Sequence, residues 1–180
     1  CRSSEQFDVL LEDLATLQSE LGVGISCERE MTTDAKAEFE AADLALAEDD
    51  LNAGRTDAAV RRMTEAAAAN PNSLSFLLMA ARAEEQSGKP KAAVGRYRTV
   101  LGIDPSNLIA LNNLAYCIIS TKGDPKEARD LAEKALKAVP NDANVMHTLG
   151  VALLRIGELA ESQKHLEKAL ERMPGEPTIM

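Results

Sequence analysis

The sequence predicts an all-α protein made of repeated helix pairs, and composition and periodicity both lead to this prediction. Alanine accounts for 29 of the 180 residues, whereas aromatic residues make up 3% of the chain and tryptophan is absent. Together with 27% charged residues, this composition is typical of closely packed helices rather than of a β-sandwich. Hydrophobic residues make up 45% of the chain, which is enough for a buried core. Glycine and proline also recur along most of the chain with one period.

The first 32 residues do not follow this period, and we expect them to form a helix and a loop. Bulky apolar residues alternate there at gaps of three and four, the spacing of a short coiled-coil seam: Phe7, Leu10, Leu14, Leu17 and Leu21. We interpret this helix as a cap over the apolar face of the first repeat. A dimer seam or a docking helix for a partner is the alternative, although two heptads alone rarely hold a dimer in water. A long helix then begins at residues 32–34 and continues into the first repeat.

Three sets of residues mark four repeats within a domain that covers residues 33–180. The prolines are Pro71, Pro105, Pro140 and Pro174, the glycines are Gly54, Gly88, Gly123 and Gly157, and the small residues are Ala59, Ala93, Ala128 and Ser162. Every set has gaps of 34, 35 and 34 residues, which divides the domain at about residues 40–73, 74–107, 108–142 and 143–176. The extra residue of the third unit falls between Ile118 and Gly123, in a turn, where insertions are tolerated.

Each unit is predicted to contain a helix, a glycine turn, a second helix and a proline stop. In the last unit, Asn141 or Asp142 can cap the first helix by accepting from its free backbone N–H groups. Gly157 ends that helix. Pro174 ends the second helix, because proline lacks the N–H group and clashes with the preceding turn.

The unit resembles the tetratricopeptide repeat, whose pattern is W-x₂-L-G-x₂-Y, then A-x₃-F, then P. From the fourth unit to the first, the initial places hold Met146, Leu149, Gly150 and Leu153; Leu111, Leu114, Ala115 and Ile118; Leu77, Ala80, Ala81 and Glu84; and Asp43, Leu46, Ala47 and Asp50. Asp43 and Asp50 depart from the apolar pattern, so the first unit matches least well. The resemblance covers about residues 40–176. It implies a right-handed superhelical α-solenoid of four helix pairs, here with an N-terminal capping helix.

Charge and motifs exclude several classes of function. The net charge of −9 argues against nucleic-acid binding, which requires a basic surface. The acidity is uneven, because residues 1–57 hold 15 acidic and 4 basic side chains, whereas residues 58–180 hold 14 and 16. His147 and His165 are the only histidines, and no zinc spacing or phosphate-binding loop occurs. We therefore expect a protein that is not an enzyme and needs neither a cofactor nor a metal.

The resemblance implies a scaffold that binds a protein or peptide segment in a concave groove lined by the first helix of each unit. The positions that it places in the groove are Leu78, Arg82, Asn112, Tyr116, His147, Val151 and Arg155, with Leu44, Glu48 and Asn52 in the first unit. Asn112 can bond a ligand backbone through both ends of its amide, and Tyr116 offers an apolar ring with a polar tip. Arg82 and Arg155 favour a partner segment of acidic character. The alternative is a structural oligomeric subunit whose repeats mainly build a complex.

The cellular setting is suggested by two weaker features. The third and fourth units resemble repeats of bacterial envelope proteins that serve polysaccharide export or pilus assembly, which implies the periplasmic side of the envelope, with a cytoplasmic location as the alternative. The sequence begins at Cys1, as processed bacterial lipoproteins do. A lipid on Cys1 is therefore the only membrane attachment that we expect. The alternative is a longer chain that was cut at this point. At the other end, the apolar face around Ala169 and Met173 has no capping helix after it, which predicts contact with another molecule.

Overall fold

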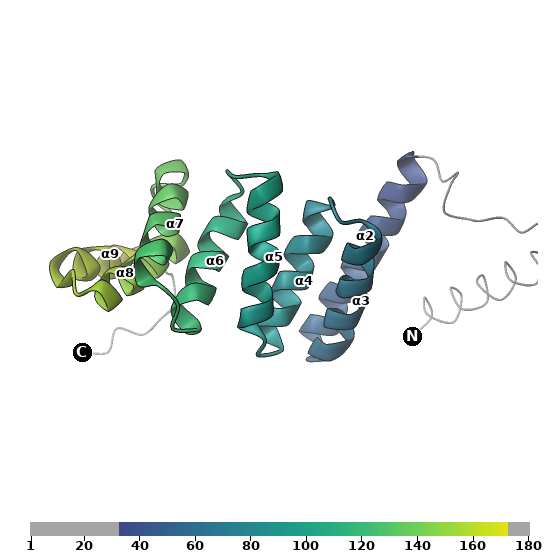
Figure 1. Cartoon of the computed structure of the whole chain (residues 1–180), viewed down its shortest axis with the longest axis horizontal. Coiled ribbons are helices and arrows are strands. Elements are labelled where there is room, and N and C mark those ends of the chain that lie inside the picture. The colour runs from purple at the N-terminus through teal and green to yellow at the C-terminus, as the bar shows by residue number, and fades with distance from the viewer. Residues whose placement is uncertain (1–32, 173–180) are drawn as a thin grey trace, which may run out of the picture. The chain divides into compact units, whose positions relative to one another are not determined.

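The structure of the protein, a computed structural model, describes residues 33–172, and these residues contain eight α-helices and no strand. The helices are α2 (Thr33–Asn52), α3 (Thr56–Ala69), α4 (Leu74–Gln86), α5 (Pro90–Ile103), α6 (Leu108–Ser120), α7 (Pro125–Ala138), α8 (Ala143–Ile156) and α9 (Leu159–Arg172). The chain divides into units of residues 1–39 and 40–180, and of the first unit only the helical residues 33–39 are described. Within the second unit, helices follow one another in chain order (Figure 1). The predicted all-α solenoid of helix pairs is confirmed.

Side chains fix the start of the first helix in three successive pairs. Ser73 accepts from the backbone N–H of Phe76 at 3.3 Å, and Asn107 accepts from that of Ala110 at 3.1 Å. Asp142, one of the two caps predicted for the last unit, accepts from the N–H of Val145 at 3.0 Å. Each cap satisfies a backbone donor that has no partner within its own helix.

The turn inside each pair contains one residue in the left-handed backbone region, and in the third pair this residue is not the predicted glycine. Gly54, Gly88 and Gly157 have φ values of 73°, 74° and 95°, whereas in the third pair Lys122 takes this conformation with φ of 58°. The backbone N–H of Gly123 bonds the carbonyl of Ile118 at 2.8 Å, as the residue after each turn glycine does in the other pairs. The extra residue of the third unit therefore follows Lys122, and the assignment of Gly123 as the turn glycine is wrong.

Small residues allow the two helices of a pair to lie close together. Ala81 and Ala115 are fully buried. At Gly150, a β-carbon would lie 2.7 Å from the side chain of Leu166 on the facing helix, which is closer than two carbon atoms can approach without a shift. The Ser162 hydroxyl donates to the Gly150 carbonyl at 2.8 Å, so the fourth pair is also joined by a buried hydrogen bond.

The two acidic residues that depart from the repeat pattern in the first unit pair with arginines. Asp50 is buried, and its carboxylate lies 2.7 Å from Arg55 and 3.7 Å from Arg62 on α3. Asp43 lies 3.8 Å from Arg62, and burial raises its pKa even though the Arg62 charge acts in the opposite direction. The departures from the apolar pattern thus form an ion-pair contact between α2 and α3.

The first helices of successive pairs approach one another more closely than the second helices do. Helix α6 contacts both α4 and α8, whereas the second helices α3, α5, α7 and α9 make no comparable contacts among themselves within the described residues. Because the stack is tighter on one side, the face lined by α4, α6 and α8 is its inner side. This face carries the pocket described below.

Several predictions fall on residues that the structure does not describe. The N-terminal helix and loop of residues 1–32, Cys1, Met173 and Pro174 all lie outside the described residues. Ala169 is described, and it is 2% exposed, so its expected role in an exposed apolar face is wrong. The large apolar side chains exposed on α9 are instead Leu159 and Leu170.

Candidate functional site

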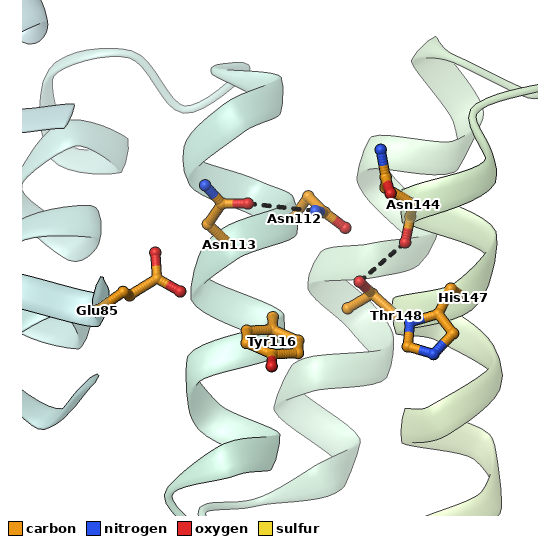
Figure 2. A pocket seen from close by; sticks show the side chains of 7 residues that line it. All are labelled: Glu85, Asn112, Asn113, Tyr116, Asn144, His147 and Thr148. Carbon is orange, nitrogen blue, oxygen red and sulfur yellow. Dashed lines mark hydrogen bonds between the residues drawn. The ribbon is translucent and has the colours of Figure 1, made fainter. Parts of the chain in front are cut away.

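A polar pocket of about 360 Å³ opens on the inner side of the stack. Three first helices line it: α4 with Glu85, α6 with Asn112, Asn113 and Tyr116, and α8 with Asn144, His147 and Thr148. Figure 2 shows the Glu85 carboxylate extending from α4 toward α6, with Tyr116 and His147 on the neighbouring helices. Glu85 is the one carboxylate among the seven lining side chains, and the other six carry amide, phenol, imidazole or hydroxyl groups.

A chain of hydrogen bonds joins the pocket to the interior. The Asn112 amide donates to Asn113 at 3.2 Å, and the Asn113 amide donates to the Tyr97 hydroxyl at 3.2 Å. Tyr97, which is fully buried on α5, donates in turn to the Glu85 carboxylate at 2.5 Å. We name Asn112, Asn113, Tyr97 and Glu85 the relay. It connects three helices that belong to two successive repeats.

Burial preserves the phenol of the relay as a hydrogen-bond donor. The pKa of Tyr97 is raised far above its usual value, first by burial and then by the hydrogen bond to Glu85 and the charge of that residue. The neighbouring thiol of Cys117 is buried as well, and burial followed by the Glu85 charge raises its pKa. Both groups therefore stay protonated at physiological pH.

Three of the predicted groove residues lie together, and two others are held by the core. Asn112, Tyr116 and His147 line the one pocket, with Tyr116 50% exposed. Leu78 and Val151 are half-buried and pack against the main apolar cluster, so they leave less side chain for a ligand. Asn112 has fewer hydrogen-bonding groups left for a ligand than predicted, because its amide nitrogen already bonds Asn113.

The two predicted basic groove residues differ in their surroundings. Arg82 donates to both oxygens of Glu48 on α2 at 2.7 and 3.0 Å. This ion pair is exposed and therefore weak, so attraction of an acidic partner by Arg82 stays a prediction. Arg155 is exposed in the last turn of α8 and does not line the pocket.

Sequence reasoning missed three pocket residues as groove positions: Asn113, Asn144 and Thr148. The family pattern assigns three groove positions to each first helix, four residues apart, and these three side chains fall outside that series. The adjacent pair Asn112–Asn113 in an otherwise apolar helix is the signal that could have revealed a polar site. The partner Tyr97 could not be predicted, because it belongs to the second helix of the preceding unit.

The described residues hold no group of three or more His, Cys, Asp or Glu side chains arranged to bind a metal ion. Within residues 33–172, no helix combines the length and the apolar character that crossing a bilayer needs. What the pocket offers is a set of hydrogen-bonding groups around one tyrosine ring, which is an arrangement suited to recognition.

The comparison with protein families agrees with the helix-pair geometry. Two family models, both described as tetratricopeptide repeat, match residues 44–107 and residues 106–174. The chain belongs to the tetratricopeptide repeat family. Proteins of this family are generally non-catalytic scaffolds for interactions between proteins.

Curated relatives share only part of their length with this tetratricopeptide repeat chain. The TPR repeat-containing protein PA4667 of Pseudomonas aeruginosa is 36% identical over 77 residues, which are 43% of this chain and 13% of that protein. Tetratricopeptide repeat protein 7A of Homo sapiens is 38% identical over 55 residues, which are 31% of this chain and 6% of that protein. The chain thus matches a small part of each of these relatives.

Solved structures share the architecture over most of the chain. MamA from Desulfovibrio magneticus RS-1 aligns with a TM-score of 0.68 and 23% identity over 76% of this chain and 77% of that one. PilF of Pseudomonas aeruginosa aligns with a TM-score of 0.67 and 25% identity over 78% of this chain and 64% of that one. At these identities the likeness supports the fold.

Proposed function

We propose that this protein is a non-catalytic scaffold that binds a segment of a partner protein along the face lined by α4, α6 and α8. The observation that carries the proposal is the polar pocket on this face, which is open to solvent and is lined by residues of three successive repeats. A segment lying across the three helices would contact several repeats at once, which is how a one-dimensional stack makes a continuous binding surface.

Tyr116 is the side chain that we expect to contribute most to binding. It is half-exposed on α6 and lies in the pocket, whereas the other described tyrosine, Tyr97, is fully buried. A rigid aromatic ring with a hydroxyl can bury apolar surface and keep a hydrogen bond, and such residues are enriched among interface hot spots. His147 faces the same pocket from α8 and can donate or accept a hydrogen bond.

The test is selection of binding segments from a displayed library of random 12-residue sequences, with the full chain as bait. Segments selected on the wild-type protein are then measured against Tyr116→Ala, His147→Ala and a matched control, Leu159→Ala, which removes an exposed apolar side chain from α9. We expect the Tyr116 change to weaken binding about 30-fold, the loss expected for a hot spot of ~2 kcal/mol. The control should bind normally. If all selected segments bind Tyr116→Ala and His147→Ala as tightly as wild type, the binding surface is not this face.

A structural role in an oligomer is the second candidate, and a specific observation favours it. Leu136 on α7 packs in an apolar cluster with Val145 of the next pair. Leu170 stands one repeat further along and is 55% exposed on α9. An assembly subunit would bury this position against another molecule, so light scattering over a concentration series should show association that Leu170→Glu abolishes. A monomer at every concentration would reject this role.

We also propose a place in an assembly of the bacterial envelope. It is supported by the resemblance of the third and fourth units to repeats of envelope proteins and by the similarity to PilF. Fractionation of native cells should find the protein with the envelope. Recovery in the cytoplasmic fraction alone would reject the proposal.

A further inference from the structure

The relay gives the pocket a fixed hydrogen-bonding polarity. A carboxylate can only accept, so the bond between Tyr97 and Glu85 must have the phenol as donor. The Tyr97 oxygen is then left to accept, and the amide nitrogen of Asn113 fills that role. The Asn113 oxygen therefore accepts from the amide nitrogen of Asn112. Each bond in the relay is thus oriented by the Glu85 carboxylate, which also lines the pocket.

This order determines what the relay presents to a ligand. With one N–H bonded to Asn113, Asn112 has its second N–H and its side-chain oxygen left for another group. That oxygen is buried and has no hydrogen-bond partner in the structure. A buried acceptor without a donor costs free energy, which a ligand that brings a donor recovers. The Asn112 end of the relay therefore favours a ligand group that donates a hydrogen bond.

The charge of the pocket specifies the donor further. Glu85 is the one carboxylate among the seven lining residues, and no lysine or arginine is among them. The predicted basic groove residue Arg82 is bonded to both oxygens of Glu48. A site with one carboxylate, an acceptor without a donor and no cation of its own is complementary to a positively charged group.

We propose that this pocket takes the side chain of a lysine or arginine residue of the partner segment. The proposal rests on the binding function proposed above and gives that face its partner chemistry. The ammonium or guanidinium group donates to the Asn112 oxygen and lies near the Glu85 carboxylate, while its methylene stem lies along the Tyr116 ring. A backbone N–H group of the partner could also satisfy Asn112 alone, but it would gain nothing from the charge of Glu85.

The test uses the segments that bind in a Tyr116-dependent manner. Each lysine or arginine in a segment is replaced, one at a time, by norleucine, which keeps an apolar stem and removes the charge and the donor. Affinities are measured at pH 8, where histidine side chains are ordinarily neutral. We expect one position at which norleucine weakens binding at least tenfold. This half of the test leaves the protein unchanged, so it does not depend on the folding of a variant.

The same segments are then measured against Glu85→Gln and against a matched control, Glu171→Gln, which removes the same charge from an exposed site on α9. Glutamine keeps an oxygen that can accept from Tyr97. On Glu85→Gln the norleucine effect should fall below threefold, whereas on Glu171→Gln it should remain at least tenfold. Equal effects on the two variants would overturn the proposal.

Failure of this inference can be told apart from failure of the proposed function. If Tyr116-dependent segments exist but tolerate norleucine at every basic position, the binding face stands and the cation pocket is overturned. If their pocket residue is acidic, the pocket is overturned in the same way. If no segment depends on Tyr116 or His147, the proposed binding face itself is rejected.

Discussion

The first two helix pairs and the last two solve the same packing problem with different chemistry. The comparison concerns one position in each pair, four residues before the left-handed turn residue. From the first pair to the fourth, this position holds Asp50, Glu84, Ile118 and Leu153. In every pair the carbonyl of this residue accepts the backbone N–H five residues later, at 2.7 to 3.0 Å. The backbone geometry is therefore the same, although two of the four side chains are carboxylates and two are aliphatic.

In the first three pairs, the facing position on the second helix changes together with the first. Asp50 and Glu84 face Arg62 and Arg96, whereas Ile118 and Leu131 both belong to the main apolar cluster or pack against it. The comparison teaches that the solenoid geometry is set by the turns and by the small residues. In these three pairs the contact between the two helices is either an ion pair or an apolar pair, and both members change together.

The largest effect should follow from breaking one ion pair on one side only. Glu84 is 5% exposed and lies 2.7 Å from Arg96. Arg96→Met leaves a buried carboxylate without its cation, which should lower the free energy of unfolding by roughly 3 kcal/mol. Urea denaturation at pH 7 measures this loss. Loss of less than 1 kcal/mol would mean that water compensates the carboxylate.

The matched control converts the second pair to the chemistry of the third. The double change Glu84→Ile with Arg96→Leu should have a stability within about 1 kcal/mol of wild type, because an apolar pair can replace a buried ion pair at little cost. If the double variant is as unstable as Arg96→Met, the two kinds of contact are not interchangeable in this fold.

A second effect should come from the close approach of the helices in the fourth pair. Gly150→Ala places a β-carbon 2.7 Å from Leu166, so the pair must separate or Leu166 must change its conformation. We expect a loss of about 1–3 kcal/mol, as overpacking usually costs. Gly95→Ala is the control, since its β-carbon would meet no atom within 4 Å, and it should raise stability by about 0.5–1 kcal/mol. Thermal unfolding compares the two, and a stable Gly150→Ala would contradict the packing argument.

The fourth pair contains a polar residue where the third has Leu131, and this difference should make its stability depend on pH. His165 takes that place on α9, and its Nδ1 atom is buried without a hydrogen-bond partner. Burial lowers the pKa of His165 from its ordinary value of 6.5; Glu161 and Glu133 act against this shift, and Lys164 and Lys168 add to it. The unfolded chain therefore binds the proton more readily than the folded protein.

This difference in proton binding determines the direction in which stability changes with pH. The contribution of neutral His165 to the free energy of unfolding is fully present above pH 6.5. It is lost as the pH falls from that value through the lowered pKa of the folded protein. His165→Leu should remove this part of the pH dependence and raise stability by about 1 kcal/mol at pH 7, because the unpaired buried nitrogen is gone. Urea denaturation between pH 5 and pH 8 measures both effects. An unchanged slope would show that His165 is not the group responsible.

The sequence predicted the parts of the fold that depend on local chemistry. Helix starts such as Asp142 and the small residues such as Gly150 follow from capping and from the period, so they could be located without a structure. Asn112, Tyr116 and His147 were assigned to one face by the resemblance to the tetratricopeptide repeat. The relay could not be foreseen, because it depends on the buried Tyr97 and on the order of its hydrogen bonds, which no spacing in the sequence encodes.

The smallest expected effect concerns the turn of the third pair, where the sequence alignment and the structure differ. Lys122 has a φ of 58°, a backbone conformation that side chains with a β-carbon adopt at a cost, whereas the other three turns have glycine there. Lys122→Gly should therefore raise the free energy of unfolding by about 0.5–1 kcal/mol. The reciprocal change, Gly88→Ala at φ of 74°, should lower the free energy of unfolding by a similar amount. No steric clash confuses the result, because nothing lies within 4 Å of the added β-carbon.

Gly123→Ala tests the alternative assignment, since its β-carbon would lie 3.0 Å from the Ile118 side chain and 3.2 Å from the Ile118 carbonyl oxygen. Urea denaturation of the three variants ranks them, and if Lys122→Gly is destabilising, the extra residue of the third repeat lies elsewhere in the turn.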